Sequence, residues 1–124
     1  MLYNNSLGKL GEDLAAKFLI KNKYKIIERN FKKRYGEIDI IAIDSSEKKP
    51  TLVFIEVKTR TSSDFGSPLE SITPWKLRSV VKSAEYYQLT HNKLPGAIRI
   101  DAISVKLKYN REVEEIEHIK NITM

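Results

Sequence analysis

Two acidic residues stand in strongly apolar, β-prone stretches of this sequence. Asp39 lies in EIDIIAID at 37–44, and Glu56 lies in TLVFIEVK at 51–58. Alternate side chains of a strand point to opposite faces. Both faces of the second stretch carry apolar residues, which is typical of a strand covered on both sides. Glu56 is therefore predicted to be buried, and a buried carboxylate needs a cation, a strong donor or a raised pKa.

Lys58 follows Glu56 by two residues and is predicted on the same strand face. One strand can then offer a carboxylate to a divalent metal and an ammonium group to an attacking water or a phosphate. Asp39 supplies a second carboxylate from the adjacent strand. This set suits phosphodiester hydrolysis, in which a metal polarises the phosphoryl oxygen and generates the nucleophile. A structural ion pair of Lys58 with either acid is the alternative, since Glu-x-Lys triplets are common in strands.

The composition limits this chemistry further. The 124 residues are 41% hydrophobic and 31% charged, which is typical of one globular domain with one core. The chain has no cysteine, which excludes disulfides, cysteine-ligated zinc and thiol nucleophiles. Its two histidines, His91 and His118, are too few for a multi-histidine metal site, and neither is assigned a role. Any metal is expected to be a hard ion held by oxygen ligands.

A basic surplus suggests a polyanionic partner. Lysine and arginine number 22 against 16 acids, a net charge of +6, which favours nucleic acid, although solubility alone would also explain it. Two basic groups are candidates for phosphate contacts, with an ordinary solvated face as the alternative: Lys32, Lys33 and Arg34, and Arg60, Lys76, Arg78 and Lys82. Three aromatic residues could stack on bases, but on a helix such residues more often belong to a core or an interface: Trp75, Tyr86 and Tyr87.

The elements that position these residues follow from periodicity and turn signals. A cap at Asn5 or Ser6 and helically spaced apolar residues predict a helix over 6–22, and Thr73-Pro74 predicts a second helix to about Asn92. A first strand is predicted to begin at 24–27 and to lead to a turn at Gly36. Four more strands are predicted over 37–44, 51–58, 97–107 and 113–120. A hairpin connection is predicted at 45–50 and a loop over 59–73. The economical packing is an α/β sandwich, with a mixed central sheet flanked by helices.

No segment resembles a targeting signal or a membrane span. The N-terminus lacks a basic stretch followed by an apolar core and a small-residue cleavage site. The longest apolar runs, such as 40–43, are far too short to cross a bilayer. We therefore expect a cytoplasmic protein that has no membrane partner.

The motifs resemble those of a known family. Gly36-Glu37-Ile38-Asp39, followed after 16 residues by Glu56-Val57-Lys58, is similar to the PD-(D/E)xK nuclease signature in its variant with a glutamate on the N-terminal helix. Ile38 stands where a proline usually precedes the acid. The chain most resembles the YraN family of uncharacterised bacterial proteins, related to archaeal Holliday-junction resolvases. Further matching residues are Gly8, Gly11-Glu12, Arg29-Asn30, 36–42, 54–60, Phe65-Gly66, Pro68 and Arg99-Ile100-Asp101.

This resemblance implies a restriction-endonuclease-like fold and a divalent-metal-dependent endonuclease that binds DNA, with branched or damaged DNA as its substrate. It implies that Asp39 and Glu56 bind Mg²⁺ or Mn²⁺, assisted by the backbone carbonyl of Val57. Lys58 would position the attacking water or stabilise the charge that develops on the phosphate.

The resemblance also gives roles to the first helix. Glu12 would reach the metal directly or through water, and Gly8 and Gly11 would let that helix approach closely. From spacing alone, a solvent-facing Glu12 is the simpler interpretation. Glu37 is predicted on the same strand face as Asp39, either behind the metal ligands or at the surface. Arg99 and Asp101 share a strand face and are expected to pair with each other.

Two other classes of function stay open at this point. One is a non-catalytic nucleic-acid-binding module that has kept the fold and the charge. The full set of Asp39, Glu56 and Lys58 argues against it, because binding alone needs no buried acids. The other is an interaction subunit that works only with a protein partner, which the shortness of the chain suggests. The related resolvases act as dimers, so a homodimer is a further expectation from the resemblance.

Overall fold

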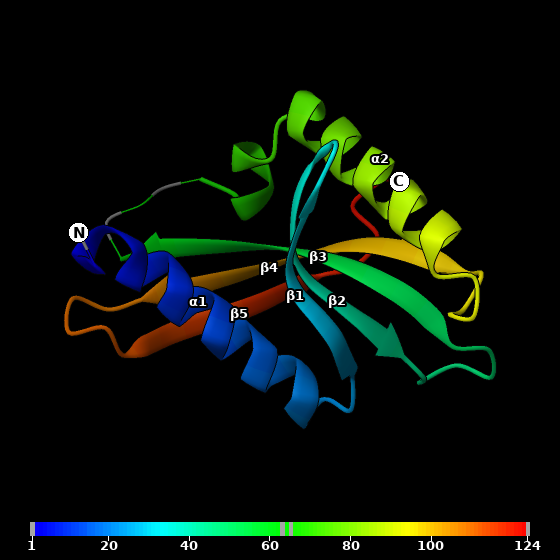
Figure 1. The fold of residues 1–124 in the computed structure, drawn as a ribbon. Coiled ribbons are helices and arrows are strands. Elements are labelled where there is room, and N and C mark those ends of the chain that lie inside the picture. Colours follow the sequence, from blue (N-terminus) through cyan, green and yellow to red (C-terminus); the bar gives the residue numbers. More distant parts are fainter. Residues whose placement is uncertain (1, 63, 65, 124) are drawn as a thin grey trace.

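A computed structural model describes residues 2–62, 64 and 66–123, and for residues 2–6 only the backbone. Two long helices and a five-stranded sheet form the molecule (Figure 1). In chain order the elements are α1 (Leu2–Lys21), β1 (Lys25–Lys33), β2 (Gly36–Asp44), β3 (Thr51–Thr61), a short 3₁₀ helix η1 (Pro68–Ser71), α2 (Pro74–Thr90), β4 (Ile98–Leu107) and β5 (Val113–Ile119).

The sheet is mixed, as the sequence predicts. Its strands lie in the order β1-β2-β3-β4-β5, and only the β3–β4 pair is parallel. A parallel pair needs a long crossover connection, which α2 supplies between β3 and β4. α1 and α2 cover opposite faces of the sheet (Figure 1). This α/β architecture is consistent with the restriction-endonuclease-like fold that the motifs lead us to expect.

Strand β3 is buried on both faces, which confirms the prediction from its apolar pattern. Val53 and Ile55 pack on the α1 side, whereas Leu52 and Phe54 pack on the α2 side. None of these four side chains is exposed. Because Glu56 continues the even-numbered series, its side chain lies on the α2 face of the sheet.

Three boundaries differ from the predictions by two residues or more, and the predicted loop over 59–73 contains the 3₁₀ helix η1. α1 begins at Leu2 and not at residue 6, so the predicted cap at Asn5 or Ser6 is wrong. β3 continues to Thr61, because Thr59–Thr61 pair with Val105–Leu107 of β4, and this long-range pairing overrides the polar, loop-like composition. α2 ends at Thr90, two residues early. Its predicted start is confirmed, since the Thr73 side chain accepts a hydrogen bond from the Lys76 N–H at 3.1 Å.

Strand β2 separates from β3 halfway along its length. It pairs with β3 only over Ile40–Asp44, whereas its pairing with β1 continues to Gly36. Ile38 packs on the α2 side together with Ile41, although an even spacing from Ile40 would place it on the α1 side. The tip of the β1–β2 hairpin consequently rises toward α2 (Figure 1). In the described ranges, no helix combines the length and apolar character needed to span a membrane.

Candidate active site

Asp39 lies where β2 stops pairing with β3, and its side chain replaces a backbone hydrogen-bond acceptor for β3. Asp39 Oδ2 accepts a hydrogen bond from the backbone N–H of Val57 at 2.8 Å. In a regular antiparallel ladder this N–H would donate to a backbone carbonyl of the neighbouring strand. Because the side chain takes the place of that backbone carbonyl, the carboxylate of Asp39 points at β3, beside Glu56. The structure therefore brings the two predicted acids together.

Glu56 is buried, as predicted, with 6% of its surface exposed. Its Oε2 lies 3.4 Å from Nζ of Lys76 on α2. Its Oε1 is buried and has no hydrogen-bond partner among the residues that the structure describes. Buried polar atoms are nearly always partnered, and a buried carboxylate oxygen without a partner is costly. This oxygen is available to a further ligand.

The electrostatics of the pair favour an added positive charge. Burial raises the pKa of Asp39 to about 7, with the charge of Glu56 as the next cause, while the Val57 N–H opposes the shift. Burial also raises the pKa of Glu56, although the ammonium groups of Lys76 and Lys58 counteract it. Two neighbouring carboxylates with raised pKa values bind either a proton or a cation more readily than isolated ones.

Asn30 joins two further acids beside this pair. Its Nδ2 donates to Glu12 Oε1 at 2.9 Å and to Glu37 Oε2 at 3.4 Å. The charges of both glutamates contribute to the raised pKa of Asp39. Asn30 has a φ of 54°, a left-handed conformation that asparagine tolerates better than most residues. Sequence reasoning gave Asn30 no role, although an asparagine within a predicted strand is unusual enough to notice.

Helix α1 approaches the sheet closely at Gly11. A Cβ added there would overlap Oγ1 of Thr59 on β3, so only glycine fits. Gly8 has no neighbour within 4 Å of such a Cβ, so the expectation that it too makes room for the helix is wrong. Glu12 follows Gly11 and is partly buried. Besides Asn30, it has Arg29 as a neighbour, with Arg29 Nη2 at 3.9 Å from its Oε1.

Lys58 stands next to the pair without joining an ion pair. Among the described residues its ammonium has no carboxylate within salt-bridge distance, and the cation that contacts Glu56 is Lys76. The alternative interpretation of Lys58 as a structural ion pair is therefore not supported. Lys58 lines an open cleft of about 430 Å³ with the end of β3 and the segment around η1: Thr59, Arg60, Asp64, Ser67, Glu70 and Ser71.

The other basic residues that are predicted to contact phosphates lie on different elements of the fold. Lys32, Lys33 and Arg34 are exposed at the tip of the β1–β2 hairpin. Arg60 is held in place, since its Nη1 donates to the Gly66 carbonyl at 2.7 Å. Lys76 contacts Glu56 and still has 40% of its side chain exposed. Phosphate binding by these residues stays a prediction.

Of the aromatic candidates, Tyr87 belongs to the core. It is 3% exposed and its ring meets that of Phe31 edge-on, with centres 4.8 Å apart. Its hydroxyl donates to Glu28 Oε1 at 2.9 Å. Tyr87 is therefore not available to a base. Trp75, in contrast, is 76% exposed.

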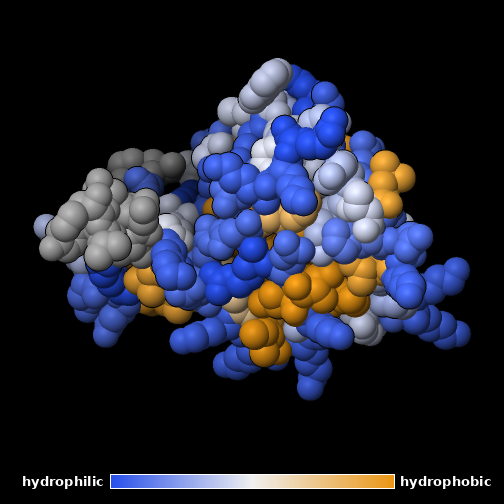
Figure 2. Space-filling view, in the orientation of Figure 1, coloured by the Kyte–Doolittle hydropathy of each residue, from blue (hydrophilic) through white to orange (hydrophobic). Residues whose placement is uncertain are grey.

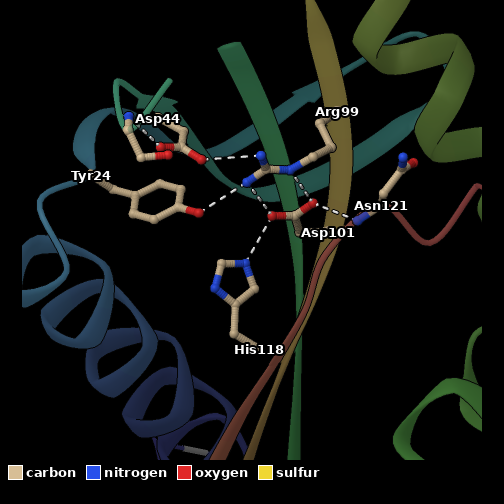
Figure 3. Close-up of polar contacts among 7 residues, drawn as sticks. Tyr24, Asp44, Arg99, Asp101, His118 and Asn121 are labelled. Carbon is tan, nitrogen blue, oxygen red and sulfur yellow. Dashed lines mark hydrogen bonds and ion pairs between the residues drawn. The ribbon is translucent and has the colours of Figure 1, made fainter. Parts of the chain in front are cut away.

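Arg99 and Asp101 form the expected pair, within a larger network on the α1 side of the sheet (Figure 3). Arg99 contacts both oxygens of Asp101 at 2.9 Å and Asp44 Oδ2 at 3.1 Å. His118 Nε2 lies 2.8 Å from the fully buried Asp101. Sequence reasoning gave His118 no role, and the available signal was an aspartate inside the apolar stretch of β4. The network also includes Tyr24 and the backbone N–H of Asn121.

In the described part of the chain, the candidate site thus contains two neighbouring carboxylates, Asp39 and Glu56, and no third that joins them. Within the described residues, no three His, Asp or Glu side chains lie close enough to hold a metal ion together. Glu12 and Glu37 influence the charge of the pair, while Asn30 engages both. The arrangement offers carboxylate oxygens of Asp39 and Glu56 as possible cation ligands, and Lys58 lies beside them without an ion pair among the described residues.

Comparison with known proteins assigns a family and no activity. The model of the uncharacterised protein family UPF0102 matches residues 11–105. A UPF0102 protein of Geobacter metallireducens is 43% identical over 120 residues, which cover 97% of this chain and 93% of the relative. Its counterpart in Syntrophomonas wolfei is 42% identical over 118 residues, covering 95% and 97%. A third, from Clostridium perfringens, is 43% identical over 119 residues, covering 96% and 94%.

Proposed function

We propose that this chain, which belongs to the uncharacterised protein family UPF0102, is a divalent-metal-dependent endonuclease that hydrolyses phosphodiester bonds in DNA. The observation that supports this function is the carboxylate pair of Asp39 and Glu56, in which one buried oxygen of Glu56 has no partner in the described part of the chain. A protein that only binds DNA has no use for such a pair. We infer a cytoplasmic location, where chromosomal DNA is accessible.

The residues present fit Mg²⁺ or Mn²⁺. Both ions prefer oxygen ligands, and Mg²⁺ is commonly bound by one or two carboxylates while it keeps several waters. Glu56 Oε1 has no hydrogen-bond partner among the described residues, so it is available to the ion. In Asp39, Oδ2 accepts the Val57 N–H, so Oδ1 is the oxygen available to the ion. The N–H and C=O of a strand residue point to the same edge. The carbonyl of Val57 therefore faces the same side as its N–H and can serve as a further ligand.

The chemistry divides between the ion and the side chains. When bound, a divalent cation supplies Lewis-acid activation of the phosphoryl oxygen and of the attacking water. Asp39 is oriented by the Val57 N–H, and Glu56 is oriented by Lys76. The ammonium of Lys58 lies on the same strand face as Glu56, where it stabilises negative charge that develops on the phosphate or orients the water. The contacts to Val57 and Lys76 thus orient both carboxylates before substrate arrives.

Substrate binding rests on charge and on the cleft beside Lys58. A net charge of +6 attracts a polyanion, and phosphate contacts supply most of the affinity for nucleic acid. The exposed cations at the hairpin tip and the cleft lined by Lys58 and Arg60 are the candidates for these contacts. The resemblance to the archaeal resolvases supports branched or damaged DNA as the substrate class.

The test is cleavage of linear, flapped and four-way DNA with Mg²⁺ or Mn²⁺. We expect the wild-type protein to cleave at least one substrate, and Asp39→Asn and Glu56→Gln to abolish cleavage. Glu47→Gln is the matched control, because Glu47 is exposed in the β2–β3 turn. Salt-sensitive binding without cleavage of any substrate would instead support the non-catalytic module. Loss of cleavage in the control as well would show that the assay does not report on the pair.

A further inference from the structure

A surface outside the acid pair combines exposed aromatic rings with cations. It lies on α2 and on the tip of the β1–β2 hairpin, where Trp75 is 76% and Tyr35 43% exposed. Both rings line one cleft of about 200 Å³, together with Arg78, Ser79 and Lys82. A second cleft, of about 320 Å³, continues along α2 from Tyr35 and is lined also by Lys82, Glu85, Tyr86 and Leu89. We call these two clefts the aromatic–basic surface.

Cations lie over rings of the aromatic–basic surface, one from α2 and one, Arg34, from the neighbouring hairpin tip. The guanidinium carbon of Arg78 lies 5.8 Å from the centre of the Trp75 ring, and that of Arg34 lies 5.9 Å from the Tyr86 ring. The rings of Tyr35 and Tyr86 meet edge-on, with centres 6.4 Å apart. Among the described residues that line the two clefts, Glu85 is the single acid. The surface is therefore complementary to a ligand that has both flat rings and negative charge.

The hairpin tip is held against α2. Ser79 Oγ donates a hydrogen bond to the backbone carbonyl of Tyr35. The next residue, Gly36, has a φ of +132°, and a Cβ added there would lie 2.7 Å from Ser79 Oγ. Only glycine permits both this backbone conformation and this approach. The backbone at Tyr35 is thereby held against α2 before any ligand binds, which lowers the ordering cost of binding.

The aromatic–basic surface begins next to the candidate active site. Trp75 precedes Lys76, whose ammonium is 3.4 Å from Glu56. A helix rises about 1.5 Å per residue, so Trp75 and Lys82 are separated by roughly 10 Å along α2. Stacked nucleotides of one strand are spaced about 3.4 Å apart, so this length accommodates roughly three of them. A strand that leaves the acid pair over the first turn of α2 would meet Trp75 first.

We propose that the aromatic–basic surface binds unpaired nucleotides of the DNA strand whose scissile phosphate lies at Asp39 and Glu56. This inference rests on the proposed nuclease function and names its substrate class: DNA with a single-stranded segment beside the cleavage point. Base faces are accessible to Trp75 and Tyr35 only when the bases are unstacked from a duplex. Figure 2 shows that the visible region around α2 and the hairpin tip is largely hydrophilic, which suits a charged strand better than an apolar protein partner.

Intrinsic fluorescence provides a direct test, because Trp75 is the only tryptophan of the chain. In EDTA, titration with oligothymidylate should quench the Trp75 emission saturably, and a blunt duplex of equal length should quench it much less. The quenching should persist in Asp39→Asn. Trp75→Ala should weaken the affinity for a labelled oligothymidylate by roughly 5- to 100-fold, the scale of one lost stacking contact. Tyr35→Ala should weaken it on the same scale, whereas Tyr109→Ala should not, since Tyr109 is a fully exposed ring on the β4–β5 turn.

Each outcome separates this inference from the nuclease function. Quenching without cleavage of any substrate would support the binding surface and overturn the nuclease. Cleavage without quenching, and with equal affinities for Trp75→Ala and Tyr109→Ala, would overturn the binding surface alone. A change of oligomeric state in Trp75→Ala at unaltered DNA affinity would identify the surface as a protein contact and would likewise overturn the inference.

Discussion

The carboxylate of Asp39 replaces a strand partner for the backbone of Val57, with Oδ2 accepting the Val57 N–H at 2.8 Å. The break between β2 and β3 is thus also the point at which two acids meet. This bond holds the Asp39 carboxylate beside Glu56; burial and the charge of Glu56 raise the pKa of Asp39, and the Val57 N–H opposes that rise. At this point the strands lack regular backbone pairing, because β2 pairs with β3 only from Ile40 onward.

Divalent cations should stabilise the folded protein. A ligand that binds only the native state adds about 2.7 kcal/mol of stability at 100 times its Kd. We expect millimolar Mg²⁺ or Mn²⁺ to raise the Tm of the wild type, and neither ion to raise that of Asp39→Asn or Glu56→Gln. Differential scanning fluorimetry measures this shift, with Glu47→Gln as the control that should respond like the wild type. A wild-type Tm that is indifferent to both ions, with and without DNA, would contradict the metal site.

Without metal, stability should fall as the pH rises from about 4 to about 7. Native Asp39 has a pKa of about 7, whereas the ordinary value is 3.8. Between these values the native state holds a proton that the unfolded chain has released, so the unfolding free energy decreases with increasing pH. Urea unfolding in EDTA at several pH values measures the slope. Asp39→Asn should reduce this dependence of the unfolding free energy on pH. Part of the dependence should persist, because the pKa of Glu56 is also raised. Identical slopes for the two proteins would show that Asp39 ionises normally.

Loss of Lys76 should destabilise the protein through Glu56. Removing one partner leaves a buried carboxylate without its cation, but Lys76 is 40% exposed, so we expect a loss of only about 1 kcal/mol in Lys76→Met. The loss should be smaller when Glu56→Gln is already present, which a double-mutant cycle by urea unfolding would measure. Lys82→Met, an exposed change on the same helix, is the control. Additive effects in the cycle would mean that Lys76 and Glu56 do not interact.

Lys58 should matter for catalysis far more than for binding. Lys58→Ala is expected to slow cleavage by a factor on the order of 10²–10⁴, the scale of a lost charge-stabilising or proton-transfer group. DNA affinity should change little, because one cation among many contributes about one unit of the salt dependence. Single-turnover cleavage and fluorescence anisotropy measure the two quantities separately. A parallel collapse of both would reassign Lys58 to substrate binding.

The basic run at the hairpin tip should contribute to the salt dependence of DNA binding. Replacing Lys32, Lys33 and Arg34 with glutamine should reduce the slope of log affinity against log salt by roughly two to three units if each contacts a phosphate. The metal-dependent rise in Tm should survive, because the carboxylates are unchanged. An unaltered slope would indicate that the three residues form only a solvated face. If the wild type shows no salt-sensitive binding to any DNA or RNA, the partner-dependent subunit becomes the better hypothesis.

Local sequence determined the parts of this protein that depend on side-chain period and on turn signals. Apolar residues on both faces of the stretch at 51–58 predict that Glu56 is buried, and the alternating direction of strand side chains predicts that Lys58 shares its face. Thr73-Pro74 predicts the start of α2. These features follow from geometry repeated within one element, so neighbouring residues suffice to reveal them. The motifs along the chain add the resemblance to a family of uncharacterised bacterial proteins, and the comparisons confirm membership of such a family, UPF0102.

Only the tertiary structure decided which groups meet. It places Asp39 against the Val57 N–H, gives Glu56 the cation of Lys76 rather than that of Lys58, and leaves Glu56 Oε1 without a partner among the described residues. Such contacts depend on where β2 stops pairing with β3 and on how α2 crosses the sheet. Both are set by packing between segments distant in the chain, and no local pattern encodes that packing.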